Sequence, residues 1–147
     1  MVAPVPDTLP TVSRFSAMTD TPEVSPDRMT DIVDDQRPWG WFRRYTLNQI
    51  STVKIISVDP GQNLSEQRHR DREELWVALD DGLRVQIDGV TTDAAVGDEF
   101  FVPTGAIHRM SCIGQSPCRV LEIAFGIFDE DDIERLSDDY GRLGDDA

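Results

Sequence analysis

Residues 97–112 of the chain, GDEFFVPTGAIHRMSC, contain the pattern that decides the fold. An aromatic and apolar run at 99–103 predicts a strand, bounded by Gly97 on one side and by a Pro103-x-Gly105 turn on the other. His108 follows this turn, which can aim the imidazole inward from a further strand. The stretch therefore predicts a strand, a tight turn and a histidine inside a sheet protein.

The same composition continues through the middle of the chain. Turn sequences such as DPGQN, DDG and GQSP separate short segments rich in β-branched and aromatic residues. Strands are predicted at 41–47, 52–58, 75–79, 83–87, 99–103 and 119–125. Closely spaced strands without helical periods between them indicate an all-β antiparallel sandwich or barrel. The acids of DEDDIERL, followed by Arg135, predict one short helical turn near the C-terminus.

The length of 147 residues suits one domain. Residues 1–36 hold five of the nine prolines and show no sustained period, which predicts a mobile, acidic arm. The folded domain is expected at 37–142, followed by a tail at 143–147.

Charge and hydropathy exclude several classes of partner. The net charge of -14 lies mainly at the two ends, so a nucleic-acid partner is not expected. No run approaches the roughly 18 apolar residues of a membrane span. The N-terminus has no basic start and no apolar core, and two cysteines are too few for a disulfide scaffold. A cytoplasmic location without membrane contact is therefore expected.

The second of the two histidines, His69, lies in GQNLSEQRHRDREELW at 61–76. Gln67 and His69 are two residues apart, so they share one face of a strand. Glu74 has the opposite parity and can join that face only if a bend or bulge falls within RDRE. An imidazole, a carboxylate and an amide oxygen together suit a divalent ion such as zinc, iron, manganese or nickel.

These two stretches fit the two-part pattern of the cupins, G-x5-(H/Q)-x-H-x3,4-E followed by G-x5-P-x-G-x2-H. The blocks RPWGWF, PGQNLSEQ and EDDIERLSDDYGR narrow the likeness, because they resemble the C-terminal cupin domain of type II mannose-6-phosphate isomerases. The resemblance spans residues 37–142 and implies a small β-barrel with a divalent ion inside it. The expected ion is zinc, with manganese, iron, nickel and cobalt as alternatives. The implied ligands are Gln67, His69, Glu74 and His108.

The resemblance also implies an activity and an assembly. The expected reaction is the interconversion of mannose 6-phosphate and fructose 6-phosphate, with a phosphosugar or other small polar molecule as the substrate. A homodimer is expected, as cupins often form, and RPWGWF could pair across it. Many members carry a mannose-1-phosphate guanylyltransferase domain, but the Gly-rich loop of that domain is absent from this sequence, so GTP chemistry is not expected.

The family pattern Q-x-H-H-H-R-x-E-H-W is only partly kept. Arg70, Asp71 and Leu75 stand where the family has its additional histidines. Two other functions therefore stay open: a metal-cupin dioxygenase, and a non-catalytic cupin that binds phosphosugars. The loss of these histidines favours the non-catalytic phosphosugar-binding cupin more than the family resemblance alone would. The block EDDIERLSDDYGR, in contrast, favours the isomerase over the dioxygenase.

Aldose–ketose isomerisation needs a base near C1 and C2, an electrophile and an anchor for phosphate. Asp71 in the charged run and Glu122 in RVLEIAF are the carboxylates that could serve as the base. Arg72 could bind phosphate or stabilise the enediolate, and Lys54 could anchor phosphate from an inward-facing strand position, so both are candidates in catalysis and in binding. Further candidates for phosphate binding are Arg109 and Arg142.

Overall fold

The computed structural model describes residues 32–143, which form strands and no helix. The strands are β1 (Val33–Arg37), β2 (Gly40–Arg44), β3 (Ser51–Val58), β4 (Glu66–Arg68), β5 (Arg72–Ala78), β6 (Leu83–Ile87), β7 (Val90–Ala94), β8 (Glu99–Val102), β9 (His108–Cys112), β10 (Cys118–Gly126) and β11 (Glu134–Ser137). No helix in this part of the chain is long and apolar enough to cross a bilayer.

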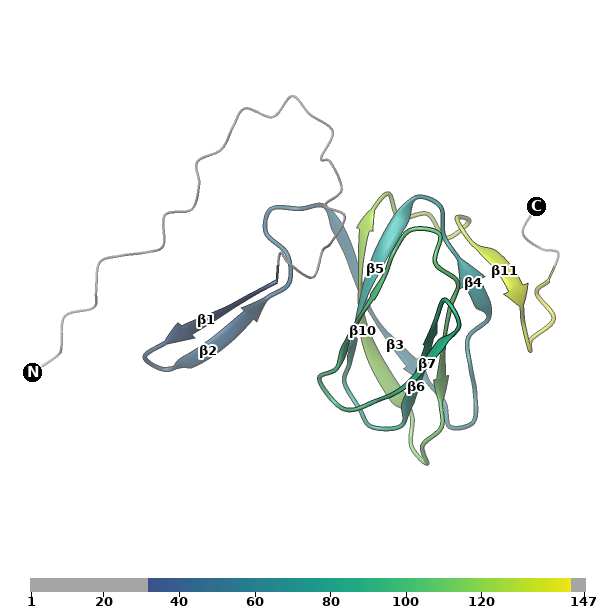
Figure 1. Ribbon diagram of the computed structural model, residues 1–147, viewed down its shortest axis with the longest axis horizontal. Coiled ribbons are helices and arrows are strands. Elements are labelled where there is room, and N and C mark those ends of the chain that lie inside the picture. Colours follow the sequence, from purple (N-terminus) through teal and green to yellow (C-terminus); the bar gives the residue numbers. More distant parts are fainter. Residues whose placement is uncertain (1–31, 144–147) are drawn as a thin grey trace, which may run out of the picture.

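Two antiparallel sheets make up the barrel. One has the order β3-β10-β5-β8, and the other has the order β11-β4-β9-β6-β7. Figure 1 shows the strands of these sheets wrapped around a common interior, with the β1–β2 hairpin standing to one side. The predicted all-β cupin fold is confirmed.

All six predicted strands are present, but β1, β4, β7, β9 and β11 were not among them. These five are short and mostly polar, so their pairing depends on neighbouring strands more than on their own composition. The predicted C-terminal helical turn is wrong. A tight turn closed by Asp132 N to Asp129 O, 3.1 Å, is followed by β11, which pairs with β4. The Arg68–Glu134 ion pair at 2.7 Å crosses this pairing, which overrides the local charge pattern.

The predicted arm at 1–36 lies largely outside the described residues, but its last part does not. Strand β1 begins at Val33, so the predicted boundary falls inside the hairpin. Arg43 joins the hairpin to the barrel through Glu99 of β8, with Nη2 and Oε1 2.8 Å apart. Trp39 and Trp41 are 74% and 59% exposed on the hairpin. The predicted homodimer remains a prediction.

The interior of the barrel changes from apolar to polar along its strands. On β5, Trp76 and Ala78 belong to the apolar core, whereas Arg72 and Glu74 occupy the two preceding inward positions. Inward polar residues also occur on β3, β9 and β10, at Lys54, His108 and Glu122. The core proper consists of Val58, Trp76, Ala78, Leu83, Val85, Ala94, Val102, Ala106, Met110, Cys112, Cys118 and Val120. One end of the barrel is therefore packed with apolar side chains, and the other holds a cluster of charged and imidazole groups.

Gly126 ends β10 where the chain passes very close to the β4–β5 connection. Its φ is +99°, and a Cβ atom there would lie 2.7 Å from the carbonyl oxygen of Asp71. We expect Gly126→Ala to lower the free energy of unfolding by about 3 kcal/mol, because backbone strain and a backbone clash add. Gly141→Ala is the matched control: its φ is +77° but its Cβ would meet nothing within 4 Å. It should cost only about 1 kcal/mol. Equal losses in urea unfolding would contradict this account.

Candidate functional site

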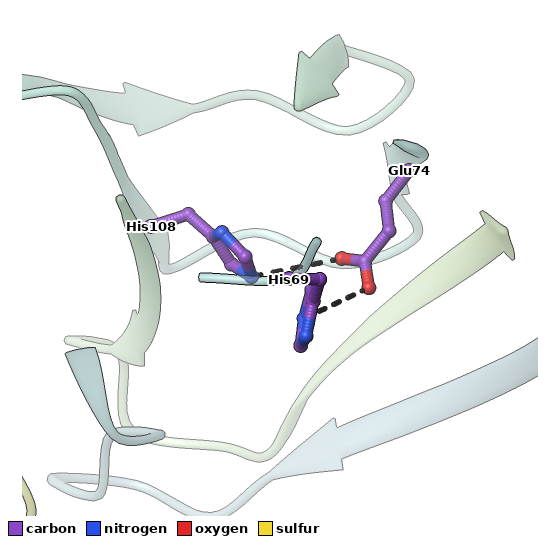
Figure 2. Close-up of side chains that lie close together, drawn as sticks. All are labelled: His69, Glu74 and His108. Carbon is purple, nitrogen blue, oxygen red and sulfur yellow. Dashed lines mark ion pairs between the residues drawn. The ribbon is translucent and has the colours of Figure 1, made fainter. Parts of the chain in front are cut away.

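His69, Glu74 and His108 form a buried cluster at the polar end of the barrel (Figure 2). Their exposed fractions are 2%, 1% and 2%. Glu74 Oε1 lies 3.2 Å from His69 Nε2, and Glu74 Oε2 lies 3.8 Å from His108 Nε2. The three potential ligand atoms all lie within 4.8 Å of one another. The structure thus brings together three of the four predicted metal ligands.

A bend between the two sheets brings Glu74 to His69. Strand β4 ends at Arg68, residues 70–71 form a bend, and β5 begins at Arg72 in the opposite sheet. This is the interruption in RDRE that the parity of Glu74 requires. These two predicted ligands therefore face each other across the interior although they are only five residues apart in sequence.

A tight turn at 103–106 positions His108. The amide of Ala106 donates to Pro103 O at 3.1 Å, and Gly105 has a φ of +80°, the sign that the third residue of a type II turn requires. The amide of Gly105 also donates to the carbonyl oxygen of His69 at 2.8 Å. The glycine-containing turn therefore links the two histidine segments directly.

Both imidazoles present the same nitrogen to the carboxylate. His69 Nδ1 lies 2.6 Å from the carbonyl oxygen of Asp132, and His108 Nδ1 lies 2.9 Å from that of Ala106. Because a carbonyl oxygen only accepts hydrogen bonds, each Nδ1 carries the proton and each Nε2 of the neutral rings carries a lone pair. His108 Nε2 is buried and makes no hydrogen bond. Two lone pairs and the carboxylate of Glu74 therefore converge.

The protonation states suit metal binding. Burial raises the pKa of Glu74, but the interactions of its carboxylate with His69, His108 and Arg72 outweigh burial and lower the pKa to about 2. Burial lowers the pKa of His108, although the charge of Glu74 opposes this effect. Glu74 is therefore anionic and His108 neutral near neutral pH, which are the forms that bind metal ions.

The cluster needs a cation, because its three facing atoms are all acceptors. Arg72 supplies one in this structure: its Nε donates to Glu74 Oε1 at 3.0 Å and its Nη2 donates to His69 Nε2 at 3.2 Å. No hydrogen bond satisfies His108 Nε2. A divalent ion bound by all three residues would satisfy this atom too, in competition with the guanidinium. Two imidazoles and one carboxylate suit zinc, manganese, iron, nickel or cobalt, so the residues fit such an ion.

The fourth predicted ligand, Gln67, lies beside the cluster. It is the partner of His108 across the β4–β9 ladder and is half-buried. Its Oε1 accepts a hydrogen bond from Ser65 Oγ at 2.7 Å. Metal ligation by Gln67 therefore stays a prediction.

Glu122 and Lys54 form a second pair at the polar end. Lys54 is the partner of Glu122 across the β3–β10 ladder, and its Nζ lies 3.5 Å from Glu122 Oε1. Glu122 is 4% exposed and its Oε1 makes no hydrogen bond. Burial raises the pKa of Glu122 to about 7, helped by the charge of Glu74 and opposed by the charges of Lys54 and Arg72. A carboxyl group with this pKa is suited to exchange protons near neutral pH.

Phe128 is a residue of this site that the sequence analysis missed. Its ring contacts two cations, with the ring centroid 4.8 Å from Lys54 Nζ and 4.4 Å from Arg72 Cζ. The next residue, Asp129, accepts a hydrogen bond from Arg72 Nη1 through its carbonyl oxygen at 2.9 Å. The segment after β10 therefore covers both candidate phosphate-binding side chains. Its only sequence signal was an aromatic residue shortly after Glu122.

Three predicted site residues lie elsewhere. The side chain of Asp71 is exposed on the bend, so the structure does not bring it into the cluster. Arg109 follows His108 on β9 and donates to Ser137 Oγ on β11 at 2.9 Å. Arg142 forms an ion pair with Asp138 beyond β11, with Nη2 and Oδ1 2.6 Å apart. Side chains alternate inward and outward along the barrel strands. Asp71 lies on the bend, Arg109 points outward from β9, and Arg142 lies after the last strand.

Comparison with known proteins decides the family. Residues 27–138 match the family model described as "Mannose-6-phosphate isomerase C-terminal". The chain belongs to this family. The chain is also similar to the alginate biosynthesis protein AlgA of Pseudomonas aeruginosa, to which it is 35% identical over 112 residues that cover 76% of this chain and 23% of AlgA. The mannose-1-phosphate guanylyltransferase ManC of Salmonella typhimurium is 35% identical over 108 residues, 73% of this chain and 22% of ManC. The chain thus spans less than a quarter of these relatives.

Two solved structures have a fold similar to that of this chain. The capsular polysaccharide assembling protein CapF of Staphylococcus aureus superposes with a TM-score of 0.56 at 13% identity, over 73% of this chain and 34% of CapF. A Klebsiella pneumoniae protein with a double-stranded β-helix domain superposes with a TM-score of 0.53 at 18% identity, over 60% of this chain and 76% of that chain. At these identities the likeness shows the fold alone.

Proposed function

We propose that the chain is a metal-dependent isomerase of sugar phosphates that interconverts mannose 6-phosphate and fructose 6-phosphate. The observation that carries this proposal is the proximity of two groups of residues within one barrel end. The His69–Glu74–His108 cluster suits a divalent ion, and Arg72 connects it to the region of Glu122 and Lys54 through Phe128. Membership of the mannose-6-phosphate isomerase C-terminal family supports the choice of substrate.

Glu122 is the proposed base. Its carboxylate removes the proton from C2 of mannose 6-phosphate and returns it to C1, while the C2 hydroxyl proton passes to the oxygen on C1, so that fructose 6-phosphate forms through an enediol. A divalent ion held by His69, Glu74 and His108 would polarise the sugar oxygens at C1 and C2. Arg72 lies beside the ligands and is placed to stabilise negative charge on the enediolate.

Lys54 is the proposed phosphate anchor. It contacts the Phe128 ring together with Arg72 and is the more exposed of these two cations, with 36% of its side chain accessible against 5% for Arg72. Since Arg72 is buried and bonded to Asp129, the substrate can reach it only when the segment at 127–129 moves away. An arriving phosphate can replace the aromatic ring as the partner of Lys54.

The test is an assay of mannose 6-phosphate conversion by the purified full chain, after removal of metal and after addition of individual divalent ions. We expect turnover that depends on metal and is lost in His69→Ala. Oxygen uptake with Fe(II), without isomerisation, would instead indicate a dioxygenase. Tight binding of the sugar phosphate without turnover would indicate a non-catalytic phosphosugar-binding cupin.

Lys54→Met is expected to raise KM for the sugar phosphate roughly 10- to 100-fold, because it removes a phosphate contact made throughout the reaction. Loss of the Lys54 charge also raises the pKa of Glu122, so kcat should change little only at a pH where Glu122 is ionised in both proteins. Lys54→Arg keeps the charge and should recover most of the affinity. Steady-state kinetics of the three proteins separate the two parameters. A fall in kcat with unchanged KM would show that Lys54 acts on Glu122 and not on phosphate.

A further inference from the structure

Asp132 lies between β10 and β11, in a segment that none of the predicted site residues occupies. It is 6% exposed. Its Oδ1 accepts the amide of Arg70 and its Oδ2 accepts the amide of Asp71, both at 2.9 Å. Its own carbonyl oxygen accepts a hydrogen bond from His69 Nδ1 at 2.6 Å. One buried residue thus makes three hydrogen bonds to three consecutive residues of the β4–β5 connection.

The two amides belong to the bend that separates His69 from Glu74. This bend carries the chain from one sheet to the other and sets the distance between the two ligands, 3.2 Å from His69 Nε2 to Glu74 Oε1. A carboxylate that accepts both amides holds the bend in one conformation. The side chain of Asp132 therefore controls where Glu74 stands relative to His69.

The backbone carbonyl group of Asp132 fixes the imidazole ring of His69. By accepting from Nδ1, it fixes the tautomer of His69 that leaves the lone pair on Nε2, and it fixes the plane of the ring. The backbone of Asp132 is itself held in place by the amides that its carboxylate accepts. Loss of the carboxylate would therefore release the ring as well as the bend.

We propose that Asp132 is a positioning residue, which holds His69 and the following bend in the arrangement that binds the metal ion. The inference rests on the metal site of the proposed function. Asp132 contacts neither the ion nor the substrate in this account, and acts only through His69 and the bend. Hydrogen-bonding partners of metal ligands typically change metal affinity by roughly 10- to 100-fold when they are removed.

The experiment compares Asp132→Asn with Asp138→Asn. Asp138 is a matched control: its buried carboxylate accepts the amides of Tyr140 at 3.2 Å and Arg142 at 2.7 Å, at the far end of β11. Cobalt(II) is titrated into the metal-free chains and followed by its visible absorption, and thermal unfolding of the metal-free chains is recorded alongside. We expect Asp132→Asn to bind cobalt roughly 10- to 100-fold more weakly with an altered spectrum, and Asp138→Asn to bind as the unsubstituted chain does.

Nitrogen-15 NMR of the imidazoles in the metal-free chains gives a second readout. We expect His69 to hold its proton on Nδ1 in the unsubstituted chain and in Asp138→Asn, and to exchange between tautomers in Asp132→Asn. Cobalt binding and a His69 tautomer that are both unchanged in Asp132→Asn would overturn the proposal. If the unsubstituted chain binds no cobalt, the metal site itself fails, whereas the NMR comparison still decides whether Asp132 positions His69.

If Asp132→Asn does not fold, a variant that retains the negative charge can be used to test the proposal. Asp132→Glu keeps both acceptor oxygens but displaces them by one methylene group. We expect its cobalt affinity to lie below that of the unsubstituted chain, with a changed spectrum. Affinity and spectrum equal to those of the unsubstituted chain would contradict the positioning role.

Discussion

Glu122→Gln is expected to lower kcat for mannose 6-phosphate isomerisation by roughly 10²- to 10⁴-fold, because it removes the proposed proton acceptor while keeping the size of the side chain. Metal affinity should change little, since Glu122 is not among the three clustered ligands. The measurement is steady-state turnover at saturating metal, with cobalt titration as the check on the site. Glu73→Gln is the control, because Glu73 is a buried carboxylate, 6% exposed, at a β5 position of the opposite parity to Glu74.

The pH dependence of turnover provides a second test of Glu122 as the base. Only the ionised carboxylate can accept a proton, so kcat/KM should fall as the pH drops through the pKa of Glu122. Burial and the charge of Glu74 place that pKa at about 7 in the metal-free chain. A bound divalent ion neutralises charge near Glu74 and moves the pKa downward, so the acidic limb is expected at or below about 7. An unchanged acidic limb in Glu122→Gln, together with normal turnover, would remove Glu122 from the mechanism.

His108→Ala is expected to weaken binding of a divalent ion by roughly 100-fold or more, because it deletes the one clustered nitrogen that no hydrogen bond satisfies. Ligand binding stabilises a folded chain by about 2.7 kcal/mol at 100 times Kd, so the unsubstituted chain should melt at a higher temperature with the ion than without it. At the same ion concentration this stabilisation should fall to about 0.4 kcal/mol or less in His108→Ala. Comparing each protein with and without the ion separates the metal effect from lost packing against Trp76.

Arg109→Ala is the matched control for His108→Ala. It lies on the same strand one residue further on, and its side chain contacts Ser137 instead of the cluster. We expect it to keep the stabilisation by metal ions. If His108→Ala also kept this stabilisation, the ion would bind somewhere other than at the clustered histidines.

Local patterns were enough to predict the main strands. Strands β3, β5 and β10 were predicted because their apolar residues recur at short range between turn residues. The predicted helical turn near the C-terminus failed for the converse reason. The acids and the arginine of DEDDIERL satisfy a local helix rule, but Glu134 and Arg135 pair with β4, more than sixty residues earlier. A short segment of the sequence contains no information about pairing with a strand so far away.

The sequence predicts those parts of the site that depend on local turns and misses those that depend on long-range contacts. Gly105 and the bend after His69 are local features that allow His69, Glu74 and His108 to meet, whereas the resemblance to the cupins predicted these residues as one set of ligands. Phe128 and Asp132 were missed because their contacts with Arg72 and His69 cross 56 and 63 positions of the sequence. Asp71 was a plausible base by composition, but the bend that aligns Glu74 turns its side chain to solvent.

The most direct measurement of the central claim is a crystal of the unsubstituted chain soaked in cobalt(II), with anomalous diffraction recorded on both sides of the cobalt edge. The account predicts one strong anomalous peak, within bonding distance of His69 Nε2, His108 Nε2 and a carboxylate oxygen of Glu74. Cobalt found only at the exposed acidic side chains, with Arg72 still bound to His69 and Glu74, would contradict it.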